Sequence, residues 1–182
     1  MLTHLRRFAG DTRGSITVEF MIWIPVIMLW LSFSVAFYDA NKNRNDAAKA
    51  AYTISDLVSR QVEVSEAFFD QLAALQDNLL PRTAANHRLR ITSIQFLEAE
   101  DEDAEDAWVV QWSAGRRGAE ALTEDTLNTN LLPPMADLDT VVLVEIAVPF
   151  VPVMQNVGIN TQTWSLPVVS RPRFVSSIVK TD

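Results

Sequence analysis

An uncharged run near the N-terminus constrains this chain more than any other feature. Residues 20–38 read FMIWIPVIMLWLSFSVAFY, which is 19 residues without a charge. As an α-helix this run would extend about 28 Å, close to the thickness of the hydrocarbon core of a bilayer. No later segment approaches its apolar content. The sequence therefore predicts a single membrane-spanning helix.

The charges on either side of this run predict its orientation. Arg6, Arg7 and Arg13 precede it, and residues 1–14 carry a net charge of +2. By the positive-inside rule, the N-terminus lies in the cytoplasm and everything after Tyr38 lies outside. The whole chain carries −8, so the part after the leader carries −10. Such an acidic protein is a poor ligand for nucleic acid, and we expect none as a partner.

Two simpler interpretations of the apolar run remain open. It could be a secretory signal peptide cleaved at the small residues 34–36, or a plain membrane anchor with no further role. The run is longer than the apolar core of a usual signal peptide. A helical pattern also continues beyond it, which favours a retained span.

The composition excludes most kinds of catalytic site. The chain has no Cys, and its two histidines are His4 and His87. Disulfides, Cys-based zinc sites and iron–sulfur clusters are therefore excluded, and a His-dependent triad has little to build on. The sequence also has no glycine-rich phosphate loop. We expect no enzyme, no catalytic residue, no metal site and no cofactor.

Glu19 is the one charge between Arg13 and Asp39, and it lies at the start of the apolar run. A carboxylate deep in a bilayer costs up to about 2.5–3.5 kcal/mol, and less near the headgroups. It could simply be solvated at headgroup level. If the chain were cut after Gly14, however, Ser15 would carry a new α-amine, and Glu19 could pair with the amine of a neighbouring helix in an assembly.

Residues 13–20 read RGSITVEF, and Pro25 follows inside the apolar helix. This stretch resembles the type IV prepilin class and, more narrowly, the TadE/TadG-like minor pseudopilins of the tight-adherence (Tad, or Flp) pilus system. In that family a short basic leader ends in Gly, a few small or apolar residues follow, and Val-Glu-Phe opens a Pro-containing membrane helix. The close match covers about residues 6–38, and the later chain resembles the family in general layout.

The resemblance implies a function in assembly. A prepilin peptidase would cleave between Gly14 and Ser15, and Glu19, Phe20 and Pro25 would serve assembly. The partners would be that peptidase, other pilins and pseudopilins of the Tad system, and the bacterial inner membrane, with the C-terminal domain in the periplasm. The alternative is an uncleaved, single-pass membrane-anchored binding module with an extracytoplasmic domain. The mature N-terminus distinguishes the two.

Two helices are predicted after the apolar run. Residues 39–60 contain no Pro or Gly, and small or apolar residues form a stripe at helical spacing: Ala47, Ala51, Ile54 and Val58. This stripe could pack on the protein's own domain or on a neighbouring helix. Ser65 can cap a second helix that Pro81 ends, with a core stripe of Phe68, Leu72, Leu75 and Leu79.

Four strands are predicted from residue 89 onward. They cover residues 89–97, 108–112, 140–150 and 161–169, with a turn at 115–118 and a loop with one helical turn at 119–134. Trp108, Val110 and Trp112 alternate with polar or smaller residues, and the third strand places Val142, Val144, Ile146 and Val148 on one face.

The expected fold is α+β, in which an N-terminal membrane-spanning helix extends into a stem and is followed by a helix and a small antiparallel sheet. The domains are a leader at 1–14, a membrane helix and stem at 15–60 with the membrane part at about 20–38, and an extracytoplasmic α+β domain at 61–182.

The remaining candidates for chemistry are weak. Seven of the nine residues 98–106 are acidic, but the stretch lacks the turn glycine and the final glutamate of a calcium loop, which favours a solvated hairpin loop. His87 has no nucleophile nearby in sequence, and we expect a surface histidine. Arg171 and Arg173 could bind an acidic partner or simply be solvated at a strand end.

Overall fold

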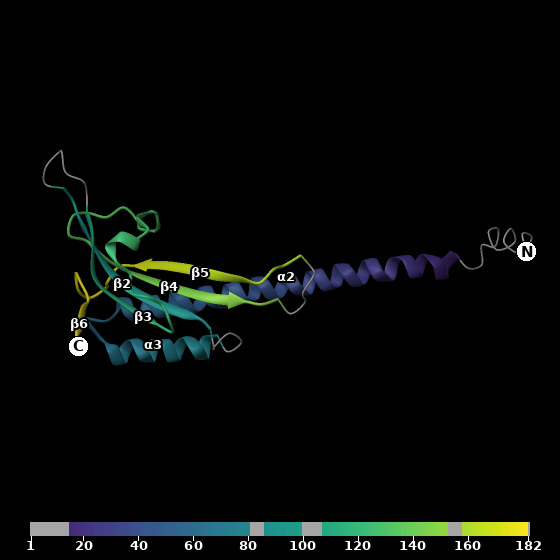
Figure 1. Cartoon of the computed structure of the whole chain (residues 1–182), viewed down its shortest axis with the longest axis horizontal. Helices are drawn as coiled ribbons and strands as arrows, with labels where there is room; N and C mark the ends of the chain where they lie inside the picture. The colour runs from purple at the N-terminus through teal and green to yellow at the C-terminus, as the bar shows by residue number, and fades with distance from the viewer. Residues whose placement is uncertain (1–14, 81–85, 100–106, 153–157, 182) are drawn as a thin grey trace, which may run out of the picture. The chain divides into compact units, whose positions relative to one another are not determined.

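The structure is a computed structural model that describes residues 15–80, 86–99, 107–152 and 158–181 (Figure 1). The two helices are α2 (Ser15–Ser59) and α3 (Glu66–Leu79). The strands are β1 (Glu63–Ser65), β2 (Arg88–Leu97), β3 (Ala107–Arg116), β4 (Thr140–Phe150), β5 (Gln162–Ser170) and β6 (Val179–Thr181). Two 3₁₀ turns, η2 (Glu124–Thr126) and η3 (Thr129–Leu131), lie between β3 and β4. The α+β class is confirmed.

The chain forms two compact units. One contains the chain up to Ala40 together with Pro152–Asn160, and the other contains Asn41–Val151 and Thr161–Asp182. The second unit holds the sheet, α3 and the C-terminal part of α2.

Helix α2 is continuous over 45 residues and contains one proline, Pro25. Its predicted stripe is fully buried: Ala47, Ala51, Ile54 and Val58 have no exposed surface. All four belong to the same core cluster as the inward-facing valines of β4. Of the two interpretations of this stripe, packing on the protein's own domain is therefore the one observed. The small alanine side chains let the helix approach the sheet closely.

The main sheet has four antiparallel strands in the order β3-β2-β4-β5. Strand β4 has the predicted bounds, and its predicted face is confirmed, because the alternate residues Val142, Val144, Ile146 and Val148 are fully buried beneath the helices. Strands β2 and β5 also lie within one residue of their predicted bounds at each end.

Strand β3 has two features that the sequence does not predict. The pairing with β2 shifts between Ser93 and Ile94, because two residues of β3 oppose one there. This bulge at Gln111 places Trp112 on the helix face, with its ring 5.6 Å from that of Phe69, while Trp108 packs in the separate cluster on the opposite face. The strand itself is as predicted, but the bulge places Trp108 and Trp112 on opposite faces, although strict alternation would place them on one face. The predicted turn also begins too early, since Gly115 and Arg116 still pair with β2.

The face of the sheet away from the helices is covered over only part of its length. Ile94, Val141 and Leu143 form a small core there under the connection that contains η2 and η3. Leu122, Leu127, Leu132 and Met135 of this connection supply the cover. The two short 3₁₀ turns replace the single helical turn that the sequence predicts.

Helix α3 begins as predicted, because the Ser65 hydroxyl accepts a hydrogen bond from the Phe68 backbone N–H. Its buried face is rotated relative to the prediction. The buried side chains are Phe69, Leu72, Ala73 and Gln76, whereas Leu79 is 38% exposed. Gln76 lies on the buried face of α3, although it is polar and the predicted apolar stripe does not include it.

The short strands β1 and β6 form a parallel pair that the sequence did not predict. Beside this pair, Lys180 Nζ lies 2.7 Å from Glu66 Oε1, and Arg116 donates to Glu66 and, at 2.7 Å, to Asp70 Oδ1. The hydrogen bonds from Lys180 and Arg116 lower the pKa of Glu66. Burial opposes the charged form of Arg116, but its bonds to Glu66 and Asp70 outweigh this and raise its pKa. These contacts hold the C-terminal strand to α3 and β3.

His87 is fully buried, so the prediction of a surface histidine is wrong. Its Nε2 lies 2.8 Å from Asp77 Oδ1 on α3, and the other oxygen of Asp77 accepts a hydrogen bond from Arg117. The carboxylate of Asp77 thus joins the start of β2 to the turn after β3. This partner is distant in sequence, which is why the local pattern around His87 gave no sign of burial.

Gly115 is required by a close backbone approach. The turn after β3 folds back so that a Cβ on Gly115 would lie 2.0 Å from the Ala119 carbonyl oxygen. We predict that Gly115→Ala destabilises the domain by about 1–3 kcal/mol, as overpacking does. Chemical unfolding of the full chain in detergent, followed by tryptophan fluorescence, measures this. Gly118→Asn is the matched control, because no atom lies within 4 Å of a Cβ there and Asn tolerates its φ of +77°. Equal stability of Gly115→Ala and wild type would contradict the prediction.

A second prediction concerns pH. The pKa of Glu66 lies below its usual value of 4.5, so its carboxylate stabilises the fold above that pH and loses its effect as the pH falls through the lowered pKa. We expect Glu66→Gln to lower stability at neutral pH and to match wild type in acid. Unfolding curves from neutral pH to below pH 4 test this, with Glu63→Gln as a control. A difference that does not change with pH would refute the role of Glu66.

Candidate functional site

The predicted assembly residues Glu19, Phe20 and Pro25 all lie on the N-terminal part of α2. Gly14 lies outside the described residues, and α2 begins at Ser15. The structure thus brings the three assembly positions onto one helix. The predicted cleavage position falls at the boundary of the described chain.

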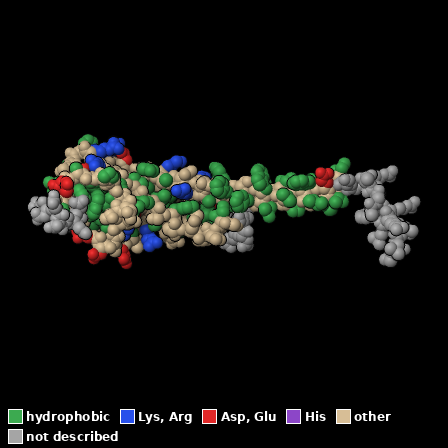
Figure 2. Space-filling model, turned by 90° about the horizontal axis from the view of Figure 1, so that it is seen from above, with side chains coloured by type: hydrophobic (Ala, Val, Ile, Leu, Met, Phe, Trp, Pro, Cys, Tyr) green, Lys and Arg blue, Asp and Glu red, His purple; other side chains and the backbone are tan. Residues whose placement is uncertain are grey.

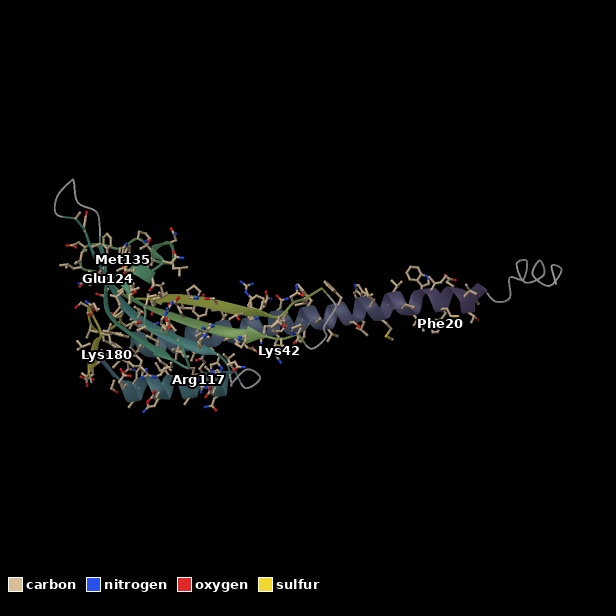
Figure 3. All side chains as sticks on the ribbon, in the orientation of Figure 1. Phe20, Lys42, Arg117, Glu124, Met135 and Lys180 are labelled. Atoms are coloured by element: carbon tan, nitrogen blue, oxygen red, sulfur yellow. The ribbon has the colours of Figure 1, made fainter. Side chains whose placement is uncertain are left out.

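The N-terminal part of α2 exposes apolar side chains on all sides. Phe20 is 61% exposed and Leu29 is 72% exposed. Only 6% of the most apolar 18-residue window is buried, and among the described residues this is the one helix long and apolar enough to cross a membrane. Figure 2 shows hydrophobic side chains spread over the helix here, and Figure 3 shows Phe20 on it. An apolar surface of this extent is not left in water and marks contact with lipid or with another apolar surface.

Polar groups within this segment are adjusted to an apolar environment. The Ser34 hydroxyl donates to the Trp30 carbonyl one turn earlier, at 2.9 Å, so it needs no external partner. Pro25 has no N–H, so the Met21 carbonyl lacks its usual helical donor. Prolines of this kind are tolerated in membrane helices where neighbouring groups compensate.

Glu19 is the exception, because it is exposed and ionisable at the edge of this apolar surface. Within the described part of the chain, no side chain forms an ion pair with it. It lies four residues after Ser15, which is about 6 Å along the helix axis. The carboxylate is therefore available to a group supplied from outside the described chain.

An open groove of about 420 Å³ lies on the uncovered part of the sheet's outer face. Arg88 and Arg90 of β2, Glu145 of β4 and Ser165 of β5 line it, with Glu120 at its rim. Arg90 Nε donates to Glu145 Oε2 at 2.7 Å. Two arginines and two glutamates balance each other, so the groove has no net charge to select a charged ligand. Sequence reasoning missed it because its residues come from separate strands.

A second groove of about 390 Å³ lies between α2 and the end of β5, and Tyr52 and Arg171 are among its lining residues. The two arginines considered in the sequence as ligands for an acidic partner are paired within the chain. Arg171 lies 3.0 Å from Asp139, and Arg173 lies 2.7 Å from Asp56. These pairs join the segment after β5 to the residue directly before β4 and to α2.

The acidic stretch lies mostly outside the described residues, which include Glu98 but not 100–106. The strands on either side of it pair as a hairpin, with Leu97 opposite Ala107. Within the described ranges, no group of three or more His, Asp or Glu residues is placed to hold a metal ion.

Comparisons with protein-family models, with curated proteins and with solved structures find no match to this chain. The function is therefore inferred from the residues of α2 and their surroundings.

Proposed function

We propose that this chain is a minor pseudopilin of the Tad (Flp) type IV pilus system. In this proposal α2 anchors it in the bacterial inner membrane, its N-terminus lies in the cytoplasm and its α+β domain lies in the periplasm. The observation that supports this most is the continuity of α2, whose exposed apolar part and buried stripe belong to one 45-residue helix. The same helix thus contributes its N-terminal part to the anchor and its C-terminal part to the core of the domain.

The leader supports the same proposal. Arg13 and Gly14 come directly before the first helical residue, Ser15. A prepilin peptidase working at the cytoplasmic face would cut between Gly14 and Ser15 and retain all of the described helix. The new amine at Ser15 would then lie at the N-terminus of α2.

We predict that the mature protein starts at Ser15 and lacks residues 1–14. Gly14→Val should crowd the peptidase site and leave the precursor uncut, while Thr12→Val, two residues earlier, should be processed normally. Intact-mass analysis of the membrane-extracted protein checks both variants. A wild-type protein that retains residues 1–14 would reject cleavage and favour the alternative, an uncleaved membrane-anchored binding module.

Glu19 would act as a specificity device in the assembly. The carboxylate of an entering subunit would meet the Ser15 amine of a subunit already in place. A shift along the helix axis would leave a charge unpaired in a low-dielectric environment, which is costly. Phe20 and the Pro25 turn would pack beside this pair and set the same register.

We predict that Glu19→Val leaves membrane insertion, cleavage and the fold of the domain intact, because it removes a charge from the edge of an apolar helix. It should impair pilus formation and recovery of the other pilins in pull-downs. Glu63→Val is the control, since Glu63 is exposed on β1 of the domain. The assay uses a strain whose sole copy carries the variant, with cleavage measured in the same sample. Normal piliation with Glu19→Val would mean that Glu19 is only a solvated headgroup-level residue.

A further inference from the structure

The apolar part of α2 has two sides that differ in their side chains. From Glu19 onward, residues spaced alternately four and three apart return to one side of the helix, because it has 3.6 residues per turn. This side carries a carboxylate and three aromatic rings, and its residues are here called the aromatic seam: Glu19, Trp23, Val26, Trp30 and Phe33. The opposite side has neither a charge nor a ring at the same spacing: Ile24, Met28, Leu31 and Val35. Phe20 and Tyr38 lie nearer the opposite side, at the first and last positions of the apolar run.

The depth of Trp30 favours a protein neighbour for the aromatic seam. Tryptophan is enriched at the two membrane interfaces, where its N–H reaches polar groups, but Trp30 is one residue from the middle of the apolar run. Its side chain is exposed, and no group among the described residues accepts a hydrogen bond from its indole N–H. An N–H left unpaired in hydrocarbon is costly, and the face of a neighbouring aromatic ring can accept it.

The rings of the aromatic seam are accessible along the helix. Trp23, Trp30 and Phe33 are each about half exposed or more. Phe37 continues the spacing, and its ring stacks on that of Phe33 with 6.5 Å between the ring centres. A partner helix that follows the aromatic seam would therefore meet aromatic rings over several turns.

We infer that the aromatic seam is the surface through which two copies of this chain pair within the membrane. The inference rests on the proposed function, because it needs α2 to span the bilayer and the chain to be cut before Ser15. Copies inserted in the same direction have parallel helices, and a seam with spacings of four and three brings each residue close to its counterpart in a symmetric pair. The Trp and Phe rings of the two copies would then pack against one another.

The charges identify a second copy as the partner. Ser15 lies four residues before Glu19 and therefore on the same side of α2. After cleavage this side begins with an α-amine and a carboxylate about one turn apart. In a parallel pair, the amine of each copy would lie within about one turn of the partner's carboxylate, so the surface is complementary to itself. The low dielectric of the membrane strengthens such a pairing.

Cysteine cross-linking in native membranes tests the pairing. The chain has no cysteine, so a single introduced cysteine can form a disulfide only with another molecule. Val26→Cys lies in the aromatic seam, and Met28→Cys lies on the opposite side at nearly the same depth. The two side chains are 52% and 57% exposed, so they are matched in exposure. Each full-length variant is expressed as the sole copy, its membranes are oxidised with copper phenanthroline, and the masses of the products and of the mature chain are measured.

We expect Val26→Cys to give at least five times as much disulfide-linked homodimer as Met28→Cys. Equal yields from the two variants, or a higher yield from Met28→Cys, would overturn pairing through the aromatic seam. A Val26→Cys product with the mass of a different protein would overturn a second copy as the partner. A mature chain that starts at Ser15 but gives no seam-specific homodimer would overturn this inference and leave the proposed function in place. A chain that keeps residues 1–14 would overturn the proposed function, and with it the amine that the pairing needs.

A second pair of variants tests the contribution of the rings. Trp30→Leu in the Val26→Cys background should lower the homodimer yield several-fold, because it removes the aromatic contact at the centre of the aromatic seam. Leu31→Val, on the opposite side, should leave the yield unchanged. Equal yields from these two variants would overturn the aromatic contact as the basis of pairing.

Discussion

The buried stripe of α2 is the surface on which the rest of the domain depends. Ala47, Ala51 and Ile54 lie against the valines of β4, and the sheet has β4 between β2 and β5. Because alanine projects only a methyl group, the helix backbone can approach the sheet, and branched side chains from β4 fill the remaining space. Helix α3 then adds Phe69 and Leu72 to the same core.

One helix therefore meets two different environments. Up to Tyr38 it is apolar on all sides, and from Ala47 onward it is apolar on one side and polar on the other. The first pattern is that of a helix surrounded by lipid, and the second is that of a helix at the edge of a water-soluble domain. Charged residues, from Asp39 to Asp46, appear at the change of pattern. The proposed function uses both parts, since an assembly subunit must be held in the membrane and present a rigid domain outside it.

The sequence predicts those elements whose residues contact others close in the chain. It also predicts strands in which the alternation of apolar residues is uninterrupted. Strand β4 has the expected bounds because its alternating valines are not broken by a bulge. The face on which Trp112 lies does not follow from the sequence, because the bulge at Gln111 arises from pairing with β2, which local alternation does not reveal.

The sequence also does not predict burial that depends on residues far apart in the chain. His87 is buried beside Asp77 of α3, and the three-residue strands β1 and β6 pair although they are far apart in sequence. Of the candidate site, the placement of Glu19, Phe20 and Pro25 on one helix was predicted, because they lie within two turns of each other. The groove at Arg90 and Glu145 was not predicted from the sequence, because its residues come from different strands.

The central claim is that α2 is one helix held by lipid in its first part and by the protein core in its second. Amide hydrogen exchange along α2, with the full chain in bilayer discs and increasing urea, tests this most directly. The account predicts that residues 47–58 lose protection together with β4 as the domain unfolds, while residues 20–38 stay protected by the bilayer. Rapid exchange of residues 20–38 in the bilayer, or loss of their protection at the same urea concentration as β4, would contradict it.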